Sequence, residues 1–257
     1  DVRQIGEGKA KPVEEVKPAK AKKYDLYGYI ERVPLRGVRR SIAKAMVKSK
    51  YTAPHVSAMD EADVTELWQI REKEKKVAEG KRIKLTILPF VIKAVVAGLT
   101  EHPYLNATLD DDSEEIILKK YFNIGLATDT PEGLMVPVVK GAKEKSIFEL
   151  AQESAQLAEK ARNRTIDLAD LKGGTFTITN HGVSGSLFAN PIINQPQCAI
   201  LGVGMIQKRP VVINDPNLGD VIAIRPMMYL SLTFDHRIID GAIADLFLAK
   251  LVDTLQK

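Results

Sequence analysis

The chain has 257 residues, of which 45% are hydrophobic and 27% charged, enough for one large domain or two small ones. The formal net charge is +4, and residues 1–23, with seven basic and four acidic side chains, contribute +3 of it. The remaining body therefore lacks the basic bias of nucleic-acid-binding proteins. The longest apolar run, 87–99, contains Pro89 and Lys93 and is too short to cross a bilayer.

A single cysteine, Cys198, excludes an internal disulfide and fits a reducing compartment. The N-terminus lacks the apolar segment of a secretory signal peptide. We therefore expect a cytoplasmic protein, or a mitochondrial-matrix protein in a eukaryote, with neither a membrane nor a nucleic acid as partner.

Residues 9–29 are expected to form a flexible linker. The stretch 9–23 consists almost entirely of Ala, Pro, Lys, Glu and Val, and it cannot bury enough apolar surface to offset its ordering entropy. A linker joins two folded parts, and only residues 1–8 precede this one. We therefore expect the chain to be part of a longer multidomain polypeptide, with its ordered body over 30–257.

The hydrophobic pattern along this body alternates between helical and strand periodicity. Helices are predicted over 36–50, 86–102 and 240–255. Two more are predicted to begin at capping boxes, one at 63–66 and one at 146–149 that continues to about 163. Strands are predicted over 55–63, 122–128, 134–139, 174–180, 197–203 and 226–235, with a shorter pair at 211–213 and 221–224. The last helix is expected to bury Ile243, Leu246, Phe247, Leu251 and Leu255. The alternation predicts an α/β fold.

A histidine near the C-terminus is the first candidate for chemistry. His236 ends the strand predicted over 226–235, and Asp240 begins the helix that follows. A histidine at a strand end, without metal-ligand neighbours, suits a general base near neutral pH. The alternatives are a structural core histidine and an aspartate that only caps a helix.

A second candidate lies upstream. Thr179 ends the strand predicted over 174–180, and a glycine-rich turn, 181–186, follows it. A hydroxyl at a strand end can donate to a developing oxyanion. Without further context, Thr179 is an ordinary strand threonine.

Five blocks of the sequence, taken together, resemble one protein family. They are TFDHRIIDGA at 233–242, GGTFTITNHGVSGSLFANPIINQPQ at 173–197, NIGLATDTPEGLMVPVVK at 123–140, PLRGVRRSIAKAM at 34–46 and PHVSAMDEADVT at 54–65. They resemble the catalytic domain of dihydrolipoyl acyltransferases, the core subunits of 2-oxo-acid dehydrogenase complexes. This resemblance implies a chloramphenicol-acetyltransferase-like domain: a mixed-sheet, sandwich-like α/β structure with flanking helices that forms trimers.

The resemblance also implies roles for individual residues. His236 is the general base that takes the proton of the coenzyme A thiol, and Thr179 donates to the oxyanion. Asp240, followed by Gly241, supports the histidine loop and pairs with an arginine. Arg39 is the candidate partner, and Arg40 stays open.

Coenzyme A is then a substrate, and the acyl group arrives on a lipoyl group carried by a separate lipoyl domain; no metal is implied. In the family, His236 of one subunit and Thr179 of its neighbour meet in a channel, and trimers assemble into a large hollow core. In the family, a 2-oxo-acid decarboxylase and dihydrolipoamide dehydrogenase bind through a subunit-binding domain. Residues 1–8 resemble the tail of such a domain.

Several points stay open at this stage. The acyl group can be branched-chain, acetyl or succinyl, and the number of trimers in the core is undetermined. Two alternative functions are considered. One is that of a related acyltransferase with an alcohol or amine acceptor, and the other is that of a non-catalytic scaffold. His181, near the proposed site, either contacts the substrate or only lines the surface, and the surface role is the simpler interpretation. His55 and His102 are interpreted as structural, and Cys198 as a small buried hydrophobe.

Overall fold

The computed structural model describes residues 24–257. The tail predicted at 1–8 and most of the predicted linker lie outside the described residues. The described chain divides into two units, of which the first ends at Arg36 and the second comprises Gly37–Lys257. In the first unit, Tyr24 and Tyr29 form an isolated antiparallel bridge with their rings edge to face, 5.5 Å between centroids.

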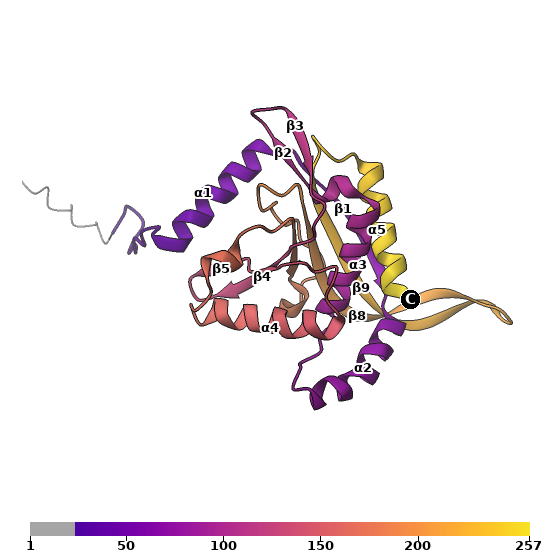
Figure 1. Ribbon diagram of the computed structural model, residues 1–257. Coiled ribbons are helices and arrows are strands. Elements are labelled where there is room, and N and C mark those ends of the chain that lie inside the picture. The colour runs from indigo at the N-terminus through magenta and orange to yellow at the C-terminus, as the bar shows by residue number, and fades with distance from the viewer. Residues whose placement is uncertain (1–23) are drawn as a thin grey trace, which may run out of the picture. The chain divides into compact units, whose positions relative to one another are not determined.

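The second unit contains all the regular elements of Figure 1. The helices are α1 (Gly37–Thr52), α2 (Thr65–Gly80), α3 (Leu88–Glu101), α4 (Ile147–Arg162) and α5 (Gly241–Gln256), with short 3-10 turns η1 (Pro103–Asn106), η2 (Leu168–Leu171) and η3 (Gly182–Ser184). The strands are β1 (His55–Asp63), β2 (Ala107–Asp110), β3 (Glu115–Leu118), β4 (Ile124–Thr130), β5 (Gly133–Met135), β6 (Val138–Val139), β7 (Phe176–Asn180), β8 (Ala199–Asp215) and β9 (Gly219–Asp235).

The main sheet mixes parallel and antiparallel pairs, as the family resemblance implied. Its order is β1-β9-β8-β7-β4-β5, and β6 also pairs with β4. The pairs β4–β7 and β7–β8 are parallel, whereas β1–β9 and β8–β9 are antiparallel. The predicted α/β class with flanking helices is therefore confirmed.

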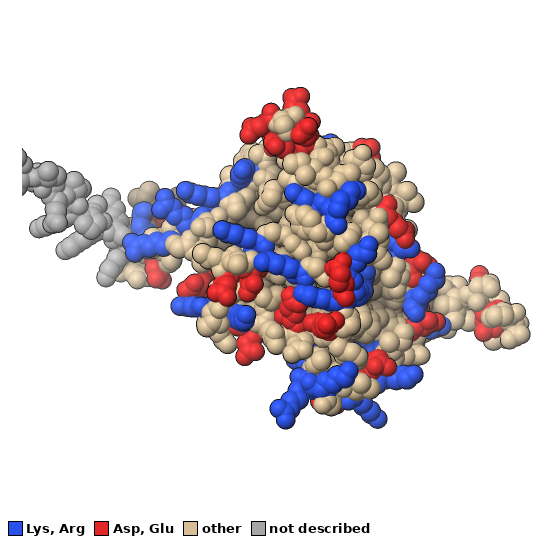
Figure 2. Space-filling view, in the orientation of Figure 1, with Lys and Arg blue, Asp and Glu red and all other residues tan. Residues whose placement is uncertain are grey.

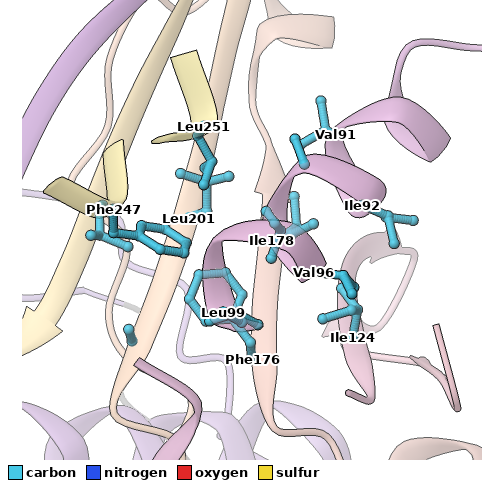
Figure 3. Packing of buried hydrophobic residues seen from close by; sticks show 14 of the residues in the cluster. Val91, Ile92, Val96, Leu99, Ile124, Phe176, Ile178, Leu201, Phe247 and Leu251 are labelled. Atoms are coloured by element: carbon cyan, nitrogen blue, oxygen red, sulfur yellow. The ribbon is translucent and has the colours of Figure 1, made fainter. Parts of the chain in front are cut away.

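The core lies between one face of this sheet and the helices α3 and α5 (Figure 3). Side chains alternate along β7, so Phe176 and Ile178 point into this core and Thr177 and Thr179 point to the opposite face. α3 approaches α5 so closely that a Cβ on Gly98 would lie 2.7 Å from the side chain of Leu251. The candidate site lies on the opposite face of the sheet.

The four strands predicted between 197 and 235 form only two. β8 and β9 are each 17 residues long and pair from Ala199–Phe234 to Asp215–Gly219, with one irregularity between Val203 and Ile206. The outer part of this hairpin extends away from the sheet (Figure 1). Its polar residues and prolines interrupt the apolar pattern, so the sequence showed the strands in pieces.

The hairpin formed by β2 and β3 was not predicted from the sequence. Its connection is acidic, with Asp110, Asp111, Asp112, Glu114 and Glu115. Figure 2 shows acidic side chains gathered at its tip. Each of these strands has only four residues and borders a charged turn. The alternation of apolar and polar residues is therefore too short to distinguish the strands from a loop.

Three local predictions were wrong. The capping box at 63–66 does not form, since α2 begins at Thr65 and Asp63 instead accepts the backbone N–H of Thr65. The strand predicted over 134–139 is divided into β5 and β6 next to Pro137, which has no N–H to donate. Leu246 on α5 is 60% exposed, because the buried face of the helix runs through Ala244, Phe247 and Leu251.

The capping box at the start of α4 is confirmed. The hydroxyl of Ser146 accepts the N–H of Glu149, and the Glu149 carboxylate accepts the N–H of Ser146 at 2.7 Å. This backbone hydrogen bond, and after it the bond that the Ser146 hydroxyl donates to the same carboxylate at 2.7 Å, hold the pKa of Glu149 below its ordinary range. The stability gained from both bonds is therefore present at pH values above the ordinary pKa of a glutamate and is lost as the pH falls through the lowered pKa.

We expect Ser146→Ala to destabilise the protein by about 1 kcal/mol, a loss of about 2–4 °C in Tm, because an N-cap acceptor is removed. Thermal unfolding at neutral and acidic pH measures it, and the difference from wild type should shrink at acidic pH. Ser184→Ala is the control, since that exposed hydroxyl has no hydrogen bond to the described residues. Equal losses in both variants would contradict the capping role.

Candidate active site

His236 lies directly after β9, at the end of the sheet where the chain leaves it. Its backbone N–H donates to the carbonyl of Pro54, 3.0 Å away, which ties the histidine to the segment before β1. The ring stands 5.9 Å from the ring of Phe234 and is exposed in the single chain. The predicted strand-end position is thus observed, and the imidazole is accessible to a substrate.

The two residues that flank His236 form an ion pair that the sequence analysis missed. The buried carboxylate of Asp235 accepts from Arg237 through Nε at 3.0 Å, Nη2 at 2.7 Å and the backbone N–H at 3.0 Å. The outer nitrogen Nη1 of Arg237 binds the exposed Asp111 of the β2–β3 connection at 2.8 Å. Hydrogen bonding to Asp235 raises the pKa of Arg237. This clamp fixes the backbone on both sides of the histidine.

Thr179 is half-buried near the end of β7 and lines a cavity of about 530 Å³ on the face of the sheet opposite the core. α1 closes the cavity with Ile42 and Met46, and most of its lining is apolar. The Thr179 hydroxyl has no hydrogen bond to any described residue, so it is free to donate. The neighbouring Thr177 is engaged, because its hydroxyl bonds to the side chain of Gln197 at 2.6 Å.

Within one chain, Thr179 and His236 do not meet. Thr179 is opposite Gly202 on β8, Gly202 is opposite Ser231 on β9, and His236 follows Ser231 by five residues. With a rise of about 3.3 Å per residue and a strand spacing of about 4.8 Å, their Cα atoms are about 16 Å apart along the strands and about 10 Å across them. Side chains of this size do not span such a distance, so a site using both residues needs two copies of the chain.

The expected partners of Asp240 are not brought together in one chain. Asp240 is the N-cap residue of α5, but its carboxylate caps no N–H and forms no ion pair with a described residue. The guanidinium of Arg39 lies beside the β4–β5 turn, 3.6 Å from where a Cβ on Gly133 would stand. Arg40 is exposed on α1, and a Cβ on Gly241 would meet open space.

Two further histidines have packing roles. His55 receives the N–H of Ile193 on Nε2 at 3.1 Å, so its Nδ1 carries the proton and donates to the carbonyl of Ala53 at 2.7 Å. His102 packs edge to face on Phe247 of α5, with 6.2 Å between ring centroids. Both residues hold chain segments together.

Cys198 is buried, and its thiol approaches the carbonyl of Tyr104 at 3.3 Å. Burial raises the pKa of this thiol to about 12, so it stays protonated near neutral pH and is a poor nucleophile. The interpretation as a small buried hydrophobe agrees with this environment.

His181 is partly buried and lines the same cavity as Thr179, close enough to the proposed site for either of the two roles considered for it. Burial lowers the pKa of its imidazole. The backbone carbonyl of Leu187 opposes this shift in part, although its geometry falls short of a hydrogen bond.

Residues 24–257 contain no cluster of three or more His, Cys, Asp and Glu side chains that could hold a metal ion. Over the same residues, no helix is both long and apolar enough to cross a membrane.

Comparison with known proteins identifies the family. Residues 28–257 match the model of the catalytic domain of 2-oxoacid dehydrogenases acyltransferase. The chain belongs to this family. It is 50% identical over 213 residues to the dihydrolipoyllysine-residue acetyltransferase component of the pyruvate dehydrogenase complex of Bacillus subtilis, a match that covers 83% of this chain and 47% of that protein. The chain thus spans about half the length of this relative.

Solved structures of such acyltransferases share the fold. The dihydrolipoamide acetyltransferase of Azotobacter vinelandii has a TM-score of 0.86 at 39% identity and covers 94% of this chain and 98% of its own. The cubic core of the pyruvate dehydrogenase multienzyme complex also gives 0.86, at 38% identity, with 94% of this chain and 98% of the other covered. A chloramphenicol acetyltransferase at 15% identity, with a TM-score of 0.51 and 82% of this chain and 94% of its own covered, shares the fold alone.

We expect Arg237→Met to lower the free energy of unfolding by about 3 kcal/mol, because it leaves the buried Asp235 carboxylate without its counter-charge. Asp111→Asn removes the exposed arm of the same clamp and should cost less than about 1 kcal/mol. Chemical denaturation measures both variants. Similar losses in the two would show that burial of Asp235 does not determine the strength of the clamp.

Proposed function

We propose that this domain transfers an acyl group from the thioester of dihydrolipoamide to coenzyme A. The observation that carries this proposal is that the chain has an exposed histidine, His236, at the end of β9 and an unbonded hydroxyl, Thr179, in the cavity at β7, in a fold of this family. The Bacillus subtilis relative and the Azotobacter vinelandii protein are both acetyltransferases by name, which supports lipoyl-linked acyl transfer here.

His236 is the proposed general base. A thiol with a pKa of about 8.5 is mostly protonated at neutral pH, and an imidazole can take its proton as the sulfur attacks. The new bond joins the coenzyme A sulfur to the acyl carbonyl carbon. When the intermediate collapses, the bond to the dihydrolipoyl sulfur breaks, and the imidazolium returns the proton to that leaving sulfur. The protein itself is not acylated.

Thr179 is the proposed donor to the oxyanion. Attack on the thioester places negative charge on the carbonyl oxygen, and a fixed hydroxyl stabilises it, an effect worth about 10²–10³ in kcat for one donor. The paired positions of Thr179 in the ladders to β4 and β8 hold the hydroxyl rigidly. In the Azotobacter vinelandii protein, a serine, a histidine and, four residues later, an asparagine have roles in the catalytic mechanism. Thr179, His236 and Asp240 follow the same order.

The two residues act across an interface in this proposal. Because Thr179 and His236 are far apart in one chain, His236 of one copy is paired with Thr179 of the next in a homotrimer. The relation to a cubic core of a multienzyme complex supports further assembly into a large hollow core. The 2-oxo-acid decarboxylase and dihydrolipoamide dehydrogenase are the proposed partner enzymes, in the cytoplasm. Lipoyl and subunit-binding domains are expected outside these 257 residues.

Mixing two inactive variants tests the shared site. His236→Ala should abolish transfer, and Thr179→Ala should lower kcat by about 10²–10³ with little change in KM. When the two variants are co-expressed in equal amounts, random trimers should regain about a quarter of the wild-type activity, because that share of interfaces is intact. Thiol release from acyl-CoA and free dihydrolipoamide measures the recovery. An inactive mixture in intact trimers would place both residues in one chain's site.

Asp240 is proposed to support the histidine loop through hydrogen bonding and not through its charge. The asparagine four residues after the histidine of the Azotobacter vinelandii protein supports this role. Asp240→Asn should therefore keep kcat within a few-fold of wild type, whereas Asp240→Ala should lower both kcat and Tm. If an ion pair with Arg39 of any copy is essential instead, Asp240→Asn and Arg39→Met will both be strongly impaired.

A further inference from the structure

The cavity beside Thr179 contains a histidine that the proposed reaction does not use. His181 follows β7 directly, two residues after Thr179. Alternation along the chain places Thr177, Thr179 and His181 on one side, and all three line the cavity of about 530 Å³. The imidazole thus lies on the same wall as the proposed oxyanion donor.

The imidazole on this wall has no hydrogen-bond partner. Both ring nitrogens of His181 are buried without a hydrogen bond to a described residue, and so is the hydroxyl of Ser231, which lies behind the lining of the cavity. The two side chains come together over Gly202, where a Cβ would lie 2.4 Å from the Ser231 oxygen and 3.0 Å from Cε1 of His181. Buried polar groups in proteins are normally paired, so unpaired donors at one place point to a ligand.

Hydrogen bonds hold the backbone of His181 in place. The N–H of His181 donates to the carbonyl of Val203 at 3.0 Å, and its carbonyl accepts the N–H of Ser184 at 3.0 Å. The next residue, Gly182, packs so closely that a Cβ there would lie 2.3 Å from the carbonyl oxygen of Gly204. This rigidity is what a recognition residue needs, because little order has to be gained on binding.

The other polar side chains in the lining of the cavity are Ser41, Thr177 and Asn194, and the Thr177 hydroxyl is already bonded to Gln197. The rest of the lining is mostly apolar, with Ile42, Ala45, Met46, Leu134, Val136 and Ile192. An acyl group that ends in methyl groups would contact the apolar side chains but would leave the imidazole unpaired. An acyl group with an acceptor at its far end would give the imidazole N–H a partner.

We propose that His181 is a specificity-determining residue that receives the distal carboxylate of a dicarboxylic acyl group, such as succinyl, whose thioester carbonyl is held at Thr179. This inference rests on the proposed acyl transfer and adds the class of acyl group. In extended chain, residues two apart have Cα atoms about 6.6 Å from each other. Three C–C bonds of about 1.5 Å place the carboxylate carbon of succinyl about 4 Å from its thioester carbon, whereas acetyl ends after one such bond. Only the longer group reaches from one residue to the other.

Acyl transfer by His181 variants tests this assignment. The assay runs from acetyl-, isobutyryl- and succinyl-CoA to free dihydrolipoamide, with the assembled protein. His181→Leu should lower the ratio of kcat/KM for succinyl-CoA to that for acetyl-CoA by about 10–100-fold, because the carboxylate loses its donor. His181→Gln, which keeps a donor, should restore part of the ratio. His102→Gln, a histidine outside the cavity, is the control and should leave the ratio at the wild-type value.

A change of less than about three-fold in that ratio with His181→Leu would overturn the proposal. If the variant instead lowers the stability of the trimer and leaves the ratio unchanged, the imidazole belongs to an interface between copies, and the proposal is equally overturned.

Failure of the reaction itself is distinguishable. If no donor supports transfer, the proposed function is wrong, and binding then decides the role of His181. In the His236→Ala background, calorimetry should show that His181→Leu weakens succinyl-CoA more than acetyl-CoA. Equal effects on the two thioesters would overturn the assignment.

Discussion

The hydrogen-bonded register of three strands, β7, β8 and β9, determines what a single chain can do. It places Thr179 opposite Gly202 and Gly202 opposite Ser231, five residues before His236. Slipping a strand by one residue would move every side chain to the other face, so a sheet buried against α3 and α5 cannot adjust to bring the two groups together. The catalytic arrangement proposed here must therefore be completed by a second copy. Assembly and activity are in this way consequences of one backbone constraint.

The same sheet separates packing from chemistry by alternation. Phe176 and Ile178 point into the core of Figure 3, and the threonines between and after them point to the cavity. Tight packing on the core face fixes the strand. The threonine hydroxyls on the cavity face are therefore positioned without any contribution from a loop. At the far end of β9 the histidine follows the strand, and there the Asp235–Arg237 clamp replaces the ladder as the positioning device. The two halves of the proposed site are thus rigid for different reasons.

Sequence reasoning succeeded where the information is local. The bounds of β1 and the capping box at Ser146 follow from short-range pattern and hydrogen bonding, and the structure has both. The strand-end position of His236 was read from the same kind of pattern, and the motif blocks led to the family. The Asp235–Arg237 pair could not be predicted, because periodicity does not show that a guanidinium folds back onto a carboxylate two residues earlier. The separation of Thr179 from His236 depends on strand pairing over long distances, which periodicity does not contain.

The ribbon made by the outer halves of β8 and β9 is held by its own cross-strand bonds and extends beyond the helices (Figure 1). Its side chains Val212, Ile222 and Ile224 are between 67% and 77% exposed, so they gain little from the core. A two-stranded hairpin without a covered face is only marginally stable in water. Amide protons near its tip will consequently exchange with solvent through fraying at a much lower free-energy cost than opening of the central sheet. Opening of the ribbon therefore need not be coupled to opening of the central sheet.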